Sequence, residues 1–113
     1  MKNLASAMLV WAFATGAFAH SSIETTQPEN GATVAEAPAE ISVTFVKKIR
    51  LTRVEMTFDE AAPVRLDLGD QKTFDRAFTL PLENMGAGTY RIEWRGLGAD
   101  GHAMQGDFMF MVD

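Results

Sequence analysis

Asp100, Gly101 and His102 form a short segment whose side chains have the chemistry of metal ligands. A carboxylate and an imidazole two residues apart point to the same side of an extended backbone. The glycine between them also permits a turn that brings the two side chains together. Such a pair is common in surface turns, so it predicts little alone. The chain has one other histidine, His20, and its position decides the interpretation.

The segment before His20 is organised like a secretory signal peptide. Residues 1–19 contain one positive charge, an apolar run over Leu4–Phe18 and an Ala-Phe-Ala ending. The run is shorter than the ~20 apolar residues that a membrane-spanning helix needs. We therefore expect cleavage after Ala19 and no membrane span in the processed protein. His20 would then be the first residue, with a free α-amine beside its imidazole.

A histidine at a free N-terminus and a second histidine in a loop offer a nitrogen-rich set of ligands. His20 supplies its α-amine and Nδ1, and His102 supplies another imidazole. Asp100 adds an oxygen and offsets part of the charge of the ion. Cu(II) prefers nitrogen-rich, tetragonal surroundings and binds most tightly among the common divalent metals. Zinc could use the same atoms but is more often tetrahedral, so the residues favour Cu(II).

The composition fits one small exported domain. Removing 19 of the 113 residues leaves 94, with nine Lys and Arg against fifteen Asp and Glu, a net charge of −6. An acidic chain without basic runs argues against nucleic acid or anionic lipid as a partner. Cysteine is absent, so the domain must rest on its hydrophobic core. These properties suit the periplasm or the outer face of a bacterial cell.

Alternating apolar residues predict an all-β fold with about seven short strands, as in immunoglobulin-like sandwiches. No segment after the signal has a helical period. A β-barrel is the main alternative. Trp94 and five other aromatic residues are expected in the core: Phe45, Phe58, Tyr90, Phe108 and Phe110. The expected strands lie at 21–26, 41–45, 54–58, 64–68, 74–80, 90–94 and 108–112, with a turn at 47–50 and an irregular connection at 32–39.

A set of residues spread over the chain after the signal is typical of one protein family. It comprises His20, Ile23, Thr26, Pro28, Gly31, Pro38, Ile41, Val43, Phe45, Pro81, Leu82, Gly88, Thr89, Tyr90, Trp94, Arg95, Asp100, Gly101, His102, Gly106, Phe110 and Val112. This set resembles the CopC family of periplasmic copper-binding proteins associated with copper resistance and uptake. The resemblance implies a Greek-key sandwich over residues 20–113 that binds one Cu(II) through His20, Asp100 and His102. It also implies a carrier role in copper resistance or homeostasis, without catalysis.

Three positions depart from the family's pattern. Lys47 stands where many members have a glutamate near copper, Gly98 where serine is usual, and Ala103 where proline is common. These differences concern the surroundings of the copper more than its three ligands.

The methionine-rich loop that some members use for Cu(I) has no counterpart in this sequence. Met104, Met109 and Met111 lie near one another and could form a face of soft ligands. Methionines in strands are far more often part of the packing.

Two other functions remain open at this stage. A metal-free immunoglobulin-like adhesion or accessory module would give His20 no role. A small copper monooxygenase could use an N-terminal histidine brace, but such enzymes are larger and have an extended substrate face. After the signal, only Tyr90 and Trp94 are available for a sugar platform. We therefore expect a non-catalytic carrier, with an inner-membrane copper transporter as a candidate partner.

Overall fold

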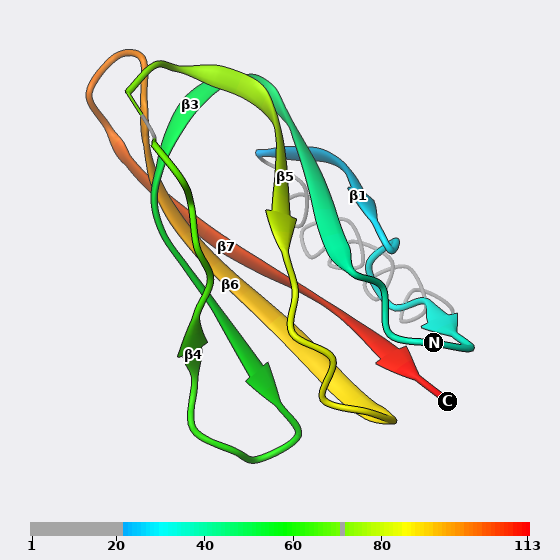
Figure 1. Ribbon diagram of the computed structural model, residues 1–113. Helices are drawn as coiled ribbons and strands as arrows, with labels where there is room; N and C mark the ends of the chain where they lie inside the picture. Colours follow the sequence, from blue (N-terminus) through cyan, green and yellow to red (C-terminus); the bar gives the residue numbers. More distant parts are fainter. Residues whose placement is uncertain (1–21, 71) are drawn as a thin grey trace, which may run out of the picture.

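The computed structural model describes residues 22–70 and 72–113, which form β-strands and connections (Figure 1). Within these ranges there is no helix that could cross a membrane. The strands are β1 (Ile23–Gln27), β2 (Thr33–Val34), β3 (Glu40–Phe58), β4 (Val64–Arg65), β5 (Asp75–Pro81), β6 (Gly88–Gly98) and β7 (Ala103–Val112). The all-β class and the number of seven strands are confirmed for the described residues, but two expected strands, 41–45 and 54–58, are parts of β3, and β2 was not expected.

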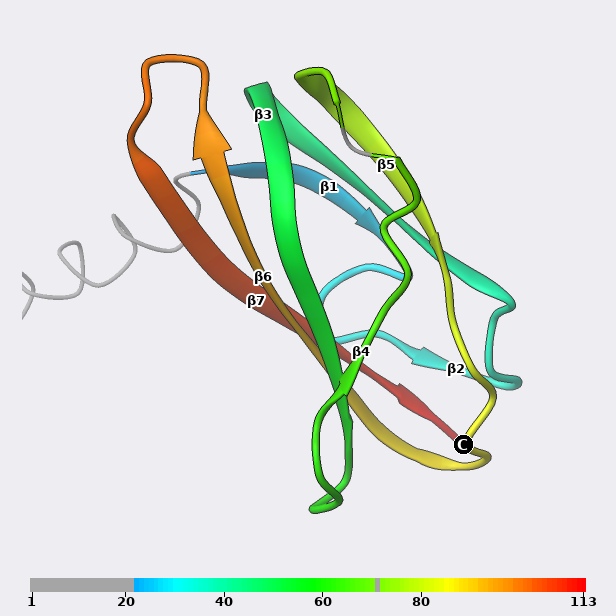
Figure 2. The ribbon, with the colours of Figure 1, turned by 60° about the vertical axis from the view of Figure 1, so that its left-hand side comes forward.

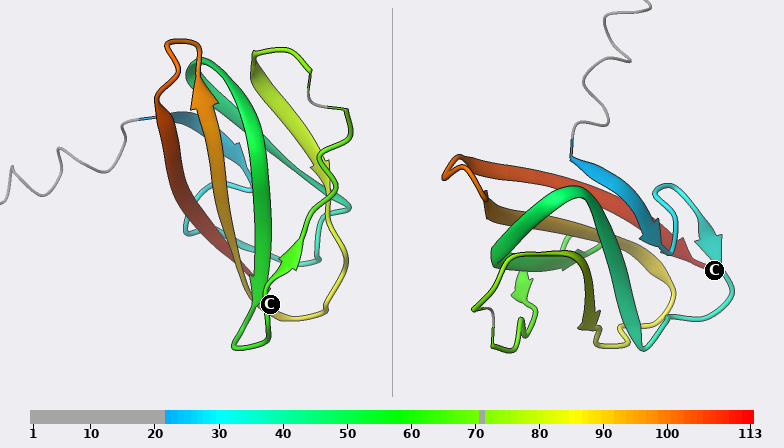
Figure 3. Two further views of the ribbon diagram at one scale, coloured as in Figure 1. Left: turned by 90° about the vertical axis from the view of Figure 1, so that its left-hand side faces the viewer. Right: turned by 90° about the horizontal axis from the view of Figure 1, so that it is seen from above.

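The strands form two layers that share β3. The first half of β3 pairs antiparallel with β1 on one side and β5 on the other. The second half pairs antiparallel with β6, which in turn pairs with β7, while β4 pairs with the end of β3. Figure 3 shows β3 arching from one layer to the other. The strand therefore closes one end of a sandwich, and the Greek-key connectivity stays an expectation from the family.

The expected turn at residues 47–50 was wrong, because β3 runs through them without a break. Val46, Lys47 and Lys48 are all exposed, and the chain bends here instead of ending a strand. The register with β5 jumps between Thr44 and Ile49 at the same place. A polar segment in the bend of a strand looks like a turn in the sequence, since both lack a buried face.

The connection at 32–39, expected to be irregular, contains β2. This two-residue strand runs parallel to the end of β7, with Thr33 beside Met111 and Val34 beside Val112. The amide of Met111 donates to the carbonyl of Ala32 at 2.9 Å. Two residues are too few to show an alternation, so the sequence could not reveal this strand.

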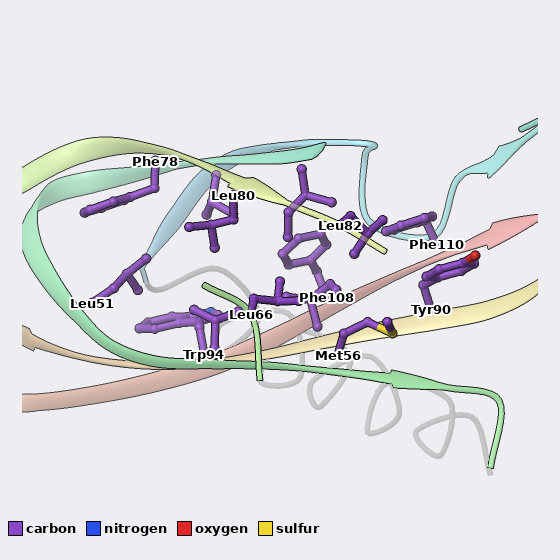
Figure 4. Packing of buried hydrophobic residues seen from close by; sticks show 14 of the residues in the cluster. Leu51, Met56, Leu66, Phe78, Leu80, Leu82, Tyr90, Trp94, Phe108 and Phe110 are labelled. Carbon is purple, nitrogen blue, oxygen red and sulfur yellow. The ribbon is translucent and has the colours of Figure 1, made fainter. Parts of the chain in front are cut away.

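The core lies between the two layers and is rich in aromatic rings (Figure 4). Trp94 is buried and meets the ring of Phe45 edge-on, with centroids 4.8 Å apart. Tyr90 stacks on Phe110 at 5.1 Å. Five of the six aromatic residues expected in the core are buried, and Phe58 packs at its margin.

The β6–β7 hairpin carries the candidate site, and the core fixes its register. Ten consecutive residue pairs join the strands, from Gly88 with Val112 to Leu97 with Ala103. Buried residues alternate along both strands, so a slip of one residue would turn every core side chain outward. The packing of the core thus determines which residues form the hairpin tip.

Candidate metal centre

The tip of the β6–β7 hairpin is a tight connection at residues 99–102. The amide of Gly101 donates to the carbonyl of Gly98 at 2.9 Å, and the amide of Gly98 donates to the carbonyl of His102 at 2.9 Å. Gly101 has a φ of +89°, a region that favours glycine. This is the pattern of a three-residue hairpin loop. Gly101 therefore closes the turn that the sequence analysis allowed for.

This turn brings Asp100 and His102 into direct contact. His102 Nδ1 lies 3.0 Å from Asp100 Oδ2, and the backbone amide of His102 donates to Asp100 Oδ1 at 3.1 Å. An ionised carboxylate only accepts hydrogen bonds, so Nδ1 carries the proton in this contact. The second ring nitrogen, Nε2, is then the one that can bind a metal, an arrangement common in metal sites.

The contact changes the acidity of both groups. The hydrogen bond from the His102 side chain, helped by that residue's backbone amide, lowers the pKa of Asp100 from its usual value. The hydrogen bond to Asp100, and then the charge of Asp100, raises the pKa of His102 above 6.5. Both side chains are largely exposed, at 69% for Asp100 and 83% for His102. A metal at Nε2 must therefore compete with protons up to a higher pH than at a free imidazole.

Replacing Asp100 by asparagine should return the pKa of His102 toward its ordinary value, because the amide lacks the charge that stabilises the imidazolium. An NMR pH titration of the His102 ring in the metal-free protein measures this shift directly. Asp107→Asn is the matched control, because it removes the same charge at an ion pair with Arg91 on the outer face of the sheet. A His102 pKa that is equal in Asp100→Asn and the unchanged protein would contradict the role of this contact.

Beside the pair lies a hollow of about 510 Å³, here called the hairpin hollow. Its lining residues come from the start of the described chain, the bend of β3 and the hairpin: Ser22, Val46, Lys47, Lys48, Ile49, Gly98, Ala99, Asp100, His102 and Met104. The amide of Val46 donates to the carbonyl of Ser22 at 2.9 Å. Ser22 is thereby fixed beside β3, and the start of β1 lies toward the same end of the molecule as the hairpin tip (Figure 2).

Two of the three expected ligands, Asp100 and His102, are thus in contact. His20 lies outside the described residues. In residues 22–70 and 72–113, no three His, Cys, Asp or Glu side chains gather into a metal-binding group. The described part of the candidate site therefore offers two donor side chains, Asp100 and His102. A metal bound there would need at least one further donor.

The sequence analysis missed the place of Met104. This residue lies on the core-facing side of β7 and lines the hairpin hollow. Met109 and Met111 are exposed on the opposite side of the strand. The three methionines therefore do not share one face of the strand, and the possibility that they form a single face of soft ligands was wrong. Only Met104 accompanies the Asp100–His102 pair.

Comparison with known proteins decides the family. The CopC domain matches residues 23–113, a range that includes the hairpin pair. The chain belongs to the CopC domain family. The CopC resemblance noted in the sequence is thus confirmed.

Individual CopC relatives agree over most of the chain. Copper resistance protein C of Xanthomonas campestris pv. juglandis is 30% identical over 105 residues, covering 85% of this chain and 82% of the relative. The protein of the same name from Escherichia coli is 27% identical over 121 aligned positions, covering 98% and 95%.

Two solved CopC-type structures are similar to this fold. PcoC from Escherichia coli, described as a methionine-rich copper resistance protein, has a TM-score of 0.58 at 27% identity and covers 84% of this chain and all of its own. CopC from Methylosinus trichosporium OB3b has a TM-score of 0.70 at 22% identity, covering 82% and 94%, and shows the shared fold alone.

Proposed function

We propose that this CopC-family chain binds one Cu(II) ion at the hairpin hollow and acts as a non-catalytic copper carrier in copper resistance. The observation that carries the proposal is the Asp100–His102 contact, which occupies Nδ1 and leaves Nε2 as the ring nitrogen available to a metal. Imidazole nitrogen suits copper, and a neighbouring carboxylate offsets part of its charge. Relatives named for copper resistance support the same metal.

His20 is the proposed source of the missing nitrogens. Ser22 lines the hairpin hollow, and an extended chain advances at most about 3.6 Å per residue, so two residues reach about 7 Å. Because Ser22 lines the same hollow as Asp100 and His102, we infer that a residue two positions before it can reach the pair. If the signal is cleaved after Ala19, the α-amine and Nδ1 of His20 can chelate the ion together. His102 Nε2 and an oxygen of Asp100 would complete a tetragonal set.

Both carboxylate oxygens of Asp100 already accept hydrogen bonds from His102. Each oxygen keeps a further lone pair, so one of them can bind copper while the pair stays in contact. Asp100 would then act as a ligand and also hold the His102 ring in position. The exposure of both side chains leaves the ion open to exchange with another protein, as a carrier requires.

The signal-like residues 1–19 favour export, which fits action in the periplasm. In that compartment an inner-membrane copper transporter is the proposed recipient or donor.

Competition titration of the chain beginning at His20 tests the proposed site. We expect one Cu(II) per chain. His102→Ala should weaken binding by more than the roughly 10–100-fold typical of an outer partner of a ligand, and Asp100→Ala should weaken it less. Asp107→Asn, which loses a carboxylate on the outer face, should leave the affinity unchanged. Absence of stoichiometric uptake, or an unchanged affinity in His102→Ala, would overturn the proposal.

A further inference from the structure

Met104 places a thioether sulfur in the same hollow as the Asp100–His102 pair. The residue is half-buried, packs against the core and follows His102 by two positions along the chain. It is the one sulfur-bearing residue in the lining of the hairpin hollow. Most methionines on the core side of a strand only fill space. This one, however, shares the hollow with a candidate metal ligand, His102.

Gly98 brings the sulfur close to the pair. A Cβ atom at Gly98 would lie 2.9 Å from Asp100 Oδ1 and 3.3 Å from Met104 Sδ. Both atoms lie close to this one point, so they are no more than about 6.2 Å apart. A side chain at position 98 would contact both of them more closely than is usual. The glycine, which replaces the serine usual in the family, thus lets Asp100 and Met104 both approach its backbone.

The charges around the hollow disfavour a doubly charged ion more than a singly charged one. Lys47 and Lys48 both line it, and Asp100 is the one carboxylate in its wall. The three groups sum to a net charge of +1, and the net repulsion is proportional to the charge of the bound ion, so Cu(I) meets half the net repulsion that Cu(II) meets. Val46 and Ile49 add apolar surface. These surroundings tolerate a monovalent, soft ion.

We propose that the hairpin hollow also binds Cu(I), with Met104 Sδ and His102 Nε2 as ligands. Thioether sulfur is a soft ligand that selects Cu(I), whereas amine nitrogen and carboxylate oxygen suit Cu(II). Methionine has three rotatable side-chain bonds, so Sδ can adjust toward the ring. The inference rests on the proposed function in one respect, because both ions would use His102. The hollow therefore holds one ion at a time, in either oxidation state.

Anaerobic titration with Cu(I) against a chromophoric chelator tests this inference on the chain beginning at His20. Met104→Leu keeps the approximate size of the side chain and removes the sulfur. We expect it to lower the Cu(I) affinity about tenfold or more, as the loss of a partner at a metal site typically does, and to change the Cu(II) affinity much less. Met109→Leu is the matched control, because Met109 is exposed on the opposite side of β7, and it should change neither affinity.

Two further measurements keep the test independent of any single variant. Gly98→Ser retains the sulfur but should also weaken Cu(I) binding, because its Cβ would lie 2.9 Å from Asp100 Oδ1 and 3.3 Å from Met104 Sδ and would force these side chains to shift. X-ray absorption of the Cu(I)-loaded, unchanged protein should show a copper–sulfur shell that is absent in Met104→Leu. A spectrum without sulfur, or equal Cu(I) affinity in Met104→Leu, overturns the inference. If the Cu(I) result is negative but the unchanged protein still binds Cu(II), the proposed function stands and only this inference fails. If the unchanged protein binds neither ion, the inference and the proposed function both fail.

Discussion

A chain that carries one extra residue before His20 is expected to bind Cu(II) orders of magnitude more weakly than the chain that begins at His20. The extra residue converts the α-amine of His20 into a peptide nitrogen, which no longer offers a ready lone pair. The chelate formed by the amine and Nδ1 is then broken, although the imidazole remains. The loss should resemble that of His20→Ala, and it should exceed that of Asp100→Ala, which removes one oxygen.

Competition titration against a chelator of known affinity measures this difference. The matched control carries the same extra residue after Asp113, where it leaves the N-terminal amine untouched. Circular dichroism should show the same fold in all three forms, because Ser22 and β1 are held through β3 whatever precedes them. Equal affinity in the extended and processed forms would mean that His20 binds through its ring alone or not at all.

Trp94→Ala should lower the free energy of unfolding of the metal-free protein by about 3–5 kcal/mol. The side chain is buried at 3% exposure in the centre of β6 and packs edge-on against Phe45. Its Nε1 has no hydrogen-bond partner among the described residues. The loss is therefore one of packing and apolar area, and not of a hydrogen bond. Urea unfolding, followed by circular dichroism, measures the change.

His102→Ala, by contrast, should leave the free energy of unfolding of the metal-free protein almost unchanged. Its side chain is 83% exposed at the hairpin tip and contributes no core contact. The loss of stability in Trp94→Phe should lie between those of Trp94→Ala and His102→Ala, because phenylalanine keeps an aromatic ring and removes the unpaired N–H. A metal-free protein that is unfolded at room temperature, or a His102→Ala variant as unstable as Trp94→Ala, would contradict a core that folds without copper.

The strands that alternate strictly were predictable from the sequence, and the path of β3 was not. Tyr90, Ile92 and Trp94 are buried in turn, as their spacing indicates. Along β3, burial passes from Ile49 and Leu51 to Val54 and Met56, because the register with β6 shifts between Leu51 and Arg53. A bulge and a bend inside one strand interrupt the period of two, so the sequence suggests two strands and a turn.

The Asp100–His102 contact was predictable because spacing and a glycine determine it locally. The hairpin hollow was not, since its wall combines Ser22, the bend of β3 and the hairpin, which are distant in sequence. The position of Met104 beside the hairpin hollow was missed because the strand was expected to begin at residue 108, whereas β7 begins at Ala103. Over an unbroken strand from 103 to 112, residues 104 and 109 must face opposite sides.

The proposed function depends on the binding of Cu(II) by nitrogen atoms of two histidines beside Asp100. Electron paramagnetic resonance of the chain beginning at His20, loaded with one equivalent of Cu(II), tests it most directly. We expect a tetragonal spectrum with nitrogen hyperfine structure, and a simpler nitrogen pattern in His102→Ala. A spectrum with oxygen ligands alone, or one that is identical in His102→Ala, would contradict it.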